Sequence, residues 1–316
     1  MKKIFSLTVL SFCFIAKAIA QDDLLADLQK EDAAKPKQNI TSATFKSTRI
    51  INMQSVEMTG VGNLQFMISH KFGYIWDDTK GSQNFSNLFG LNSGYANAYL
   101  SFDYSPKWWL NIGAALANQG VYEGWAKFKI LRQQTGIKDV PVSVVWVSLF
   151  RADATAGPSP DDLAWNRFSF LNQLLVARKF NENLSLQLNG SLIHNNYVPY
   201  GYKNTNNVFN VGLSGRYKIA AKKAITFEYT HQINGWKYQT DESGTVFNYV
   251  PDLIAIGYDW DTGGHIFQFY VSNTTESSNV KQLSTNMGNW KKGNFALGFT
   301  INRSYSVKKV VKADAH

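Results

Sequence analysis

Apolar and polar residues alternate along most of the chain after residue 60, and residues 253–271 show the pattern most clearly. Successive side chains of a β-strand point to opposite faces, so the large apolar residues of the first half share one face: Ile254, Ile256, Tyr258 and Trp260. Asp261-Thr262-Gly263-Gly264 predicts a tight turn, since glycine supplies the positive φ that short hairpins need. Folding the chain about Thr262-Gly263 would place Tyr258 opposite Phe267.

The opposite face of this hairpin is small or polar, with Ala255, Gly257, Gln268 and Ser272. One apolar face and one polar face suit a strand that has lipid on one side and water on the other. Residues 253–271 therefore predict a hairpin of an outer-membrane β-barrel.

The same alternation recurs along the chain and predicts an all-β fold. We expect a transmembrane antiparallel up-and-down β-barrel of about twelve strands, within a range of about ten to fourteen. The connections after every second strand are short and most of the others are long, which is the rule for bacterial barrels. A secreted β-sandwich is the soluble alternative, and it would show no such pattern of connection lengths.

The N-terminus indicates secretion. Lys2 and Lys3 precede an apolar stretch at residues 4–15, and Ala18-Ile19-Ala20 matches a cleavage site for a signal peptide. We expect residues 1–20 to be removed and the mature protein to reach the outer membrane, with an uncleaved anchoring helix as the alternative. The only cysteine, Cys13, lies in the apolar stretch, so no disulfide is expected in the mature chain.

The remaining chain divides into three predicted parts. Residues 21–60 form an N-terminal extension, either periplasmic or lumenal, residues 61–305 the barrel, and residues 306–316 a charged tail. Residues 43–60 alternate irregularly, which leaves open whether they form a strand, a plug or a periplasmic tether.

The composition of the chain narrows the classes of molecule that it is expected to bind. The formal net charge is +9, but the basic residues are scattered, whereas nucleic-acid proteins usually cluster them. Aromatic residues make up 14% of the chain, as the interfacial girdles of a barrel require. We therefore expect outer-membrane lipid as the main partner, with a small solute or a periplasmic protein as further options. No nucleic acid is expected, and a monomer is favoured.

One segment also resembles a known family. The strings Thr44-Phe45-Lys46-Ser47-Thr48-Arg49-Ile50-Ile51-Asn52 and Ser55-Val56-Glu57 are similar to the opening of an outer-membrane β-barrel family of Bacteroidota, and Ser69-His70-Lys71-Phe72-Gly73 continues the similarity. The resemblance covers roughly residues 44–303 and is strongest over 44–73. The family is of unknown function, so the resemblance implies a fold and a location but assigns no catalytic residue.

The sequence gives only weak support for a catalytic site or a metal site. Asp261-Thr262-Gly263 spells an aspartic-protease triplet, but that chemistry needs a second carboxylate and the triplet lies at a hairpin tip. The histidines His70, His194, His231 and His265 are far apart in sequence and have no metal-ligand spacing. We expect no enzyme activity, no cofactor and no metal. The enzymatic alternative, a membrane-embedded hydrolase, would need a serine paired with a histidine such as His231.

The polar face instead predicts a set of lumenal charges: Lys71, Lys127, Lys129, Arg216, Asp103 and Glu228. Folding about residues 219–224 would bring Arg216 opposite Glu228 as a cross-strand ion pair. These charges either brace a narrow interior or form an anion-preferring constriction. The function expected is a passive channel or transport component for small solutes, with anionic solutes as one option. The alternative is a non-conducting barrel that docks periplasmic or surface partners, which a plug at residues 43–60 would favour.

Overall fold

The computed structural model describes residues 38–76, 85–86, 88–90, 96–118, 120–154, 164–198, 202–203, 206–234, 237–239, 246–247 and 252–307. The predicted signal peptide and the charged tail from residue 308 lie outside the described residues. The chain forms two compact units. The smaller one pairs β1 (Asn39–Ile40) antiparallel with β6 (Gln134–Thr135), and Gln38 donates hydrogen bonds to the carbonyls of Thr135 and Lys138.

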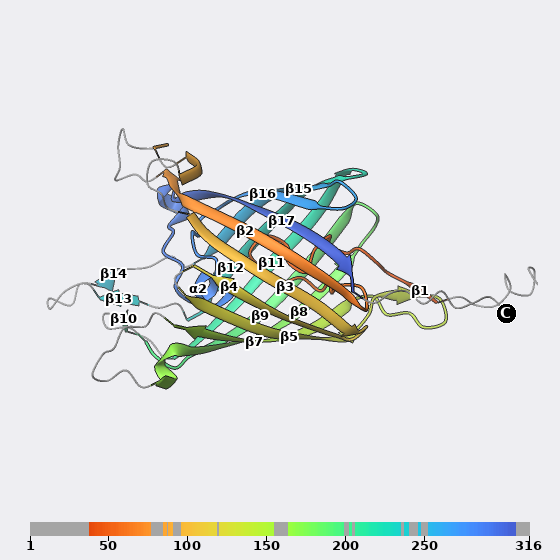
Figure 1. Cartoon of the computed structure of the whole chain (residues 1–316), viewed down its shortest axis with the longest axis horizontal. Coiled ribbons are helices and arrows are strands. Elements are labelled where there is room, and N and C mark those ends of the chain that lie inside the picture. Colours follow the sequence, from red (N-terminus) through yellow and green to blue (C-terminus); the bar gives the residue numbers. More distant parts are fainter. Residues whose placement is uncertain are drawn as a thin grey trace, which may run out of the picture. The chain divides into compact units, whose positions relative to one another are not determined.

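The larger unit is a closed antiparallel barrel of twelve strands, as the alternation predicted. Each strand pairs with the next along the chain, and the last pairs with the first (Figure 1). The strands are β2 (Asn63–Trp76), β3 (Ala96–Lys107), β4 (Leu110–Ala117), β5 (Val121–Leu131), β7 (Ser143–Asp153), β8 (Phe168–Lys179), β9 (Leu184–Asn195), β11 (Asn207–Ala220), β12 (Lys223–Gln232), β15 (Leu253–Asp261), β16 (Ile266–Ser272) and β17 (Phe295–Ser306).

Shorter elements lie between these strands. They are a three-stranded sheet of β10 (Tyr202–Lys203), β13 (Lys237–Gln239) and β14 (Val246–Phe247), the helix α2 (Asn279–Ser284), and three 3-10 helices at Leu88–Gly90, Ala164–Arg167 and Trp290–Lys292. Residues 164–167 form a helical turn just before β8, and β7 continues to Asp153. Within the described residues, no helix is long and apolar enough to cross a membrane.

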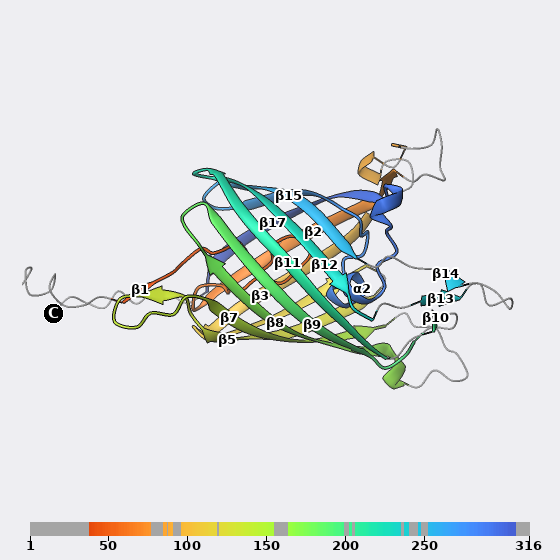
Figure 2. The same ribbon diagram turned by 180° about the vertical axis from the view of Figure 1, so that it is seen from behind.

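Alternation also predicted the two faces of the wall. Along β15 the side chains of Ile256 and Trp260 are exposed, whereas Ala255 and Asp259 are buried. The same period runs along β8 and β9, which face the viewer in Figure 2. Since exposed positions are apolar and buried ones are mostly small or polar, the outer face suits lipid and the inner face lines a lumen.

The cross-strand pairing within the hairpin of residues 253–271, now β15 and β16, was predicted wrongly. Phe267 pairs with Trp260, and Tyr258 pairs with Phe269, two residues away from the expected partner. The reason is a longer loop at residues 262–265, in which Thr262 N–H donates to the carbonyl of His265 and Gly263 adopts a φ of 91°. A shift by two residues keeps every side chain on its face, so the predicted faces survive the error.

Leu188 provides a direct test of the lipid face. It lies in the middle of β9 with 61% of its side chain exposed. Leu188→Arg is expected to lower the free energy of unfolding by about 2–4 kcal/mol, since a cation near the bilayer midplane loses its hydration. Urea titration of the refolded protein in lipid vesicles measures the loss, with Leu188→Met as the matched control. Equal stability of the two variants would contradict the assignment of this face to lipid.

Candidate functional site in the barrel lumen

Residues 44–57 enter the lumen and form a plug. The chain enters and leaves at the barrel end that carries the short connections, where Thr41 N–H donates to the carbonyl of Gln133 and Gly62 N–H to that of Ser105. Between these points the plug folds back on itself, with Ser55 N–H bound to the carbonyl of Thr48 at 3.0 Å. Of the three alternatives left open for residues 43–60, the structure has the plug.

Glu228, on β12, holds the tip of the plug. Its Oε1 accepts the backbone N–H groups of Ile51 at 2.8 Å and Met53 at 2.9 Å, and its Oε2 accepts that of Asn52 at 2.9 Å. Three successive N–H groups thus converge on one carboxylate, which is only 1% exposed. Charge-assisted bonds of this kind are stronger than neutral ones, so Glu228 fixes the depth to which the plug enters.

Lys127, on β5, holds the base of the plug. It binds backbone carbonyl oxygens, whereas Glu228 binds backbone N–H groups. Its Nζ donates to the carbonyl oxygens of Thr48 at 2.6 Å, Ser55 at 3.3 Å and Glu57 at 3.4 Å, and the side chain is fully buried. The ammonium therefore bridges the two arms of the plug. Lys129, two residues further along β5, is half-buried and makes no hydrogen bond to the plug within the described residues.

Neutral wall side chains complete the plug contacts. Gln187 Oε1 accepts from Val56 N–H at 2.9 Å while its Nε2 donates to the carbonyl of Gln54 at 2.8 Å, so one amide pairs with the plug backbone as a strand would. Gln268 Nε2 donates to the carbonyl of Ile50 at 2.6 Å. Asp103 accepts from Thr48 Oγ1 at 3.0 Å and from Trp125 Nε1 at 2.9 Å. The plug is therefore anchored around much of the wall.

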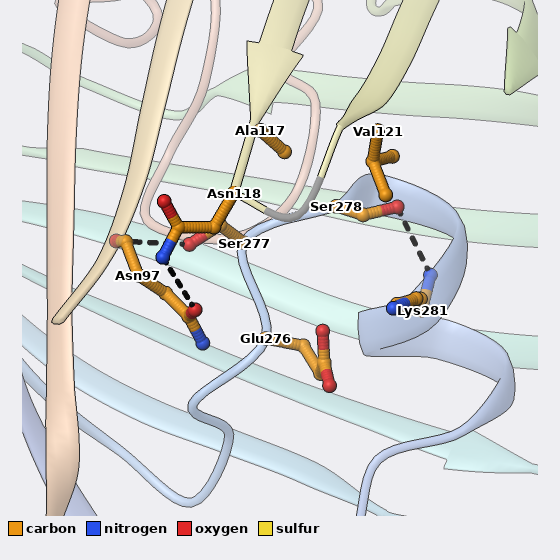
Figure 3. A pocket seen from close by; sticks show the side chains of 8 residues that line it. All are labelled: Asn97, Ala117, Asn118, Val121, Glu276, Ser277, Ser278 and Lys281. Atoms are coloured by element: carbon orange, nitrogen blue, oxygen red, sulfur yellow. Dashed lines mark hydrogen bonds between the residues drawn. The ribbon is translucent and has the colours of Figure 1, made fainter. Parts of the chain in front are cut away.

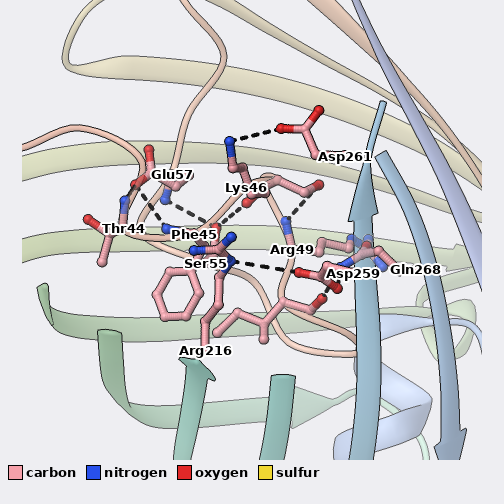
Figure 4. A network of polar contacts seen from close by, with 12 residues as sticks. Thr44, Phe45, Lys46, Arg49, Ser55, Glu57, Arg216, Asp259, Asp261 and Gln268 are labelled. Carbon is pink, nitrogen blue, oxygen red and sulfur yellow. Dashed lines mark hydrogen bonds and ion pairs between the residues drawn. The ribbon is translucent and has the colours of Figure 1, made fainter. Parts of the chain in front are cut away.

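The expected ion pair between Arg216 and Glu228 does not form. Arg216 pairs with Thr226 across the strands, and Glu228 lies opposite Ser214, because the turn spans residues 221–222 alone and a bulge follows Lys218. Arg216 Nε lies instead 3.9 Å from Asp259 Oδ2 on β15. Figure 4 shows this pair below the plug, with Lys46 of the plug 2.9 Å from Asp261.

A second segment closes the lumen from the other end. Residues 273–288, here called the inner loop, lead from β16 through α2, and most of their side chains are buried. Glu123 on β5 receives this loop, since its Oε1 accepts from Ser278 Oγ at 2.6 Å and its Oε2 accepts from Asn279 Nδ2 at 2.6 Å and Tyr99 Oη at 2.9 Å. The inner loop and the plug thus fill the lumen from opposite ends.

Lys71 joins the two segments. Its Nζ donates to Asn52 Oδ1 of the plug at 2.5 Å, and to the Glu276 carbonyl at 2.6 Å and Gln282 Oε1 at 3.0 Å in the inner loop. Beside it, the plug guanidinium of Arg49 contacts the hydroxyl of Tyr99 and lies 4.3 Å from the centre of that ring. Tyr99 in turn accepts from Asn279 of the inner loop.

Two cavities beside these segments are small. One has a volume of about 20 Å³ and lies beside the inner loop, lined by Asn97, Ala117, Asn118, Val121, Glu276, Ser277, Ser278 and Lys281 (Figure 3). Another, of about 10 Å³, lies at the junction around Lys71 and Arg49. Each is large enough for about one water molecule. The plug and the inner loop therefore leave little free space where they meet.

Sequence reasoning placed its six lumenal charges on the correct face but missed most of their partners. Lys71, Lys127, Arg216, Asp103 and Glu228 are all buried, and Lys129 is half-buried. Arg49, Tyr99 and Gln187 were not predicted to take part in these contacts. The inward glutamines were visible in the alternation, but their bonds to the plug backbone depend on a segment that had no assigned place.

The structure also tests the geometry of a hydrolase. His231 Nδ1 lies 2.8 Å from Asp252 Oδ1, and Tyr229 Oη donates to Asp252 Oδ2 at 2.7 Å. A carboxylate thus orients His231, which sequence reasoning had not foreseen. Within the described residues no serine or threonine hydroxyl hydrogen bonds this histidine, and no group of three or more histidine, cysteine, aspartate or glutamate side chains could hold a metal ion.

Comparison with known proteins shows which family has this architecture. The model of the family described as "Membrane bound beta barrel domain (DUF5777)" matches residues 45–305, which include the plug and all twelve wall strands. The chain belongs to this family. Its members are described as membrane-bound barrels, in agreement with the apolar outer face found here. A search of curated proteins found no match.

One solved structure shows the same type of fold, and two porins are less similar. An outer membrane channel, COG4313, from Pseudomonas putida F1 superposes with a TM-score of 0.50 at 13% identity, covering 79% of this chain and 98% of the other. The KdgM porin has a TM-score of 0.43 at 8% identity, and the NanC porin 0.43 at 10% identity. Each of these two covers 77% of this chain and 98% of its own. At such identities the likeness concerns the fold alone.

Proposed function

We propose that this protein is an outer-membrane channel for small solutes whose lumen is closed by its own plug and inner loop, and which conducts when these segments are displaced. The observation that carries the proposal is that two segments of the chain fill the centre of the lumen. An eight-stranded barrel is just wide enough for wall side chains to fill it. A barrel of twelve strands encloses more space, so removal of these segments leaves a passage lined in part by polar side chains.

The orientation follows from the connections. Connections at residues 108–109, 180–183, 221–222 and 262–265 are short, and short turns of outer-membrane barrels face the periplasm. The plug enters from that end, so it closes the lumen from the periplasmic side and the inner loop closes it from outside. This orientation agrees with export by the signal peptide expected at residues 1–20. The Pseudomonas putida structure is likewise described as an outer membrane channel.

The second candidate is a barrel that does not conduct and docks a partner. The same plug favours it, because a closed lumen carries no solute. The two functions therefore differ in whether the plug can be displaced to open the lumen. The plug is held by hydrogen bonds to single side chains, whereas the wall is a closed ladder of paired strands. Segments with fewer stabilising contacts open before the whole fold does.

Planar-bilayer recording of the refolded full-length protein in rising urea tests the proposal. We expect little current without urea, and discrete conductance steps at urea concentrations that leave the barrel folded, as judged by gel mobility without heating. Removal of urea should close the channel again as the plug returns. Absence of current up to the concentration that unfolds the barrel would overturn the channel and favour the docking barrel.

A further inference from the structure

The inner wall of the barrel has an apolar side, which is unusual for a passage that carries water. Four inward side chains form one row across neighbouring strands: Leu149, Leu171, Ile193 and Val208. Val145, Val147 and Leu175 lie on the same face of β7 and β8, and all seven are at most 3% exposed. Lumens of membrane barrels are ordinarily polar, so these positions break the rule on four adjacent strands, β7, β8, β9 and β11.

Several ionised groups lie on other strands: β2 and β3 are across the lumen from β8 and β9, whereas β5 adjoins β7. Lys71 on β2, Asp103 on β3, and Glu123 and Lys127 on β5 are all buried and hydrogen bonded. The lumen around α2 therefore combines hydrocarbon on β7, β8 and β9 with ionised groups on β2, β3 and β5.

The helix α2 has apolar side chains that pack in the apolar cluster and polar side chains that bind the charged groups. Val280 and Leu283 are buried in the same apolar cluster as the four-residue row, and α2 contacts β8 and β9. From the same helix, Asn279 donates to Glu123 and Gln282 accepts from Lys71. An amphipathic piece of the chain thus occupies the space between hydrocarbon and charge, as a bound amphiphile would.

We propose that this space takes an amphipathic solute, with a hydrocarbon body against the row Leu149, Leu171, Ile193 and Val208 and an anionic head near Lys71. The inference rests on the proposed channel function and specifies its substrate class. Displacement of the inner loop exposes the apolar row to water, and a hydrocarbon chain that covers it gains about fourfold in affinity for each methylene group fully buried. The neutral oxygen atoms now bound by Lys71 are replaced by an anion, which forms stronger charge-assisted bonds.

Current block in an opened channel tests the inference. Glu228→Ala combined with Leu283→Ser releases the plug tip and one apolar anchor of α2. The probes are hexane-1-sulfonate and methanesulfonate, which stay charged and differ only in chain length. We expect hexanesulfonate to block the potassium chloride current at a concentration at least about tenfold lower than methanesulfonate, because several additional methylene groups are buried.

Wall variants in the same background locate the site. Leu171→Ser with Ile193→Ser should remove the preference for the longer sulfonate, while Gln173→Ser, at an inward polar position of the same strand, should retain it. Lys71→Met should weaken the block by both sulfonates and leave the dependence on chain length. If the double wall variant does not insert, Leu171→Ala alone must weaken the hexanesulfonate block, and an unchanged block overturns the inference.

The failures of the two proposals are distinguishable. An opened channel that carries potassium chloride but is blocked equally by both sulfonates retains the channel and overturns the amphipathic substrate. A Glu228→Ala and Leu283→Ser protein that folds and carries no current overturns the channel itself, and the substrate with it.

Discussion

Glu228→Ala, in a background in which Leu283→Ser loosens the inner loop, is expected to turn a closed barrel into one that conducts continuously in planar bilayers. The variant removes the acceptor for three successive buried N–H groups, those of Ile51, Asn52 and Met53. Each buried donor left without a partner costs about 1–3 kcal/mol, so the seated plug loses several kcal/mol. Within the described residues the hydrogen bonds of this carboxylate all go to the plug backbone, so the loss falls mainly on the plug.

Glu228→Gln provides the matched control. The amide keeps one oxygen that can accept N–H groups, so its openings should be fewer and shorter than those of the alanine variant. Amide hydrogen exchange gives an independent readout, because residues 51–53 should exchange quickly in Glu228→Ala while the strands stay protected. Protected tip amides in a conducting variant would show that another segment controls the opening.

Lys127→Glu is expected to expel the plug more completely than any neutral substitution. The variant replaces an ammonium with a carboxylate opposite the carbonyl oxygens of Thr48, Ser55 and Glu57. The position is fully buried, where an uncompensated charge costs about 3–5 kcal/mol. We expect fast exchange of amides along the whole plug, and persistent current in the same Leu283→Ser background.

Lys129→Glu is the matched control for Lys127→Glu, because it makes the same change of charge at a different position. It makes the same change on the same strand, at a half-buried side chain that does not hydrogen bond to the plug within the described residues. Its lumen should remain closed. If Lys127→Glu fails to fold, Lys127→Met removes the donor without adding a negative charge and should give intermediate opening. Equal behaviour of the two glutamate variants would contradict the role assigned to Lys127.

The lumenal ion pair shows what alternation along a sequence can and cannot predict. Alternation has a period of two, so it placed Arg216 and Glu228 on the inner face correctly. A shift of the strands by two residues leaves that period unchanged, and the partner across the strands therefore stays undetermined. Turn length decides it, and residues 221–222 form a shorter turn than the sequence suggested. Faces were predictable for this reason, whereas partners were not.

The plug escaped prediction for a different reason. Its backbone hydrogen bonds are largely to side chains of the wall, such as Gln187 and Glu228, rather than to a neighbouring strand. A segment held in that way needs no regular period. Its irregular pattern at residues 43–60 was compatible with a strand, a plug or a tether, and only the position of wall residues more than a hundred positions later decides among them.

The place of the plug before the first wall strand has a consequence for assembly. Ile51 is made 177 residues before its partner Glu228, and Gln54 is separated from Asn279 by 225 residues. Contacts over such separations form slowly, since a long loop must close before they stabilise anything. The final pairing of β17 with β2 encloses whatever already lies between the strands. A plug that is present at that moment is built in, and its polar backbone can serve as a template around which the inward side chains of the wall arrange.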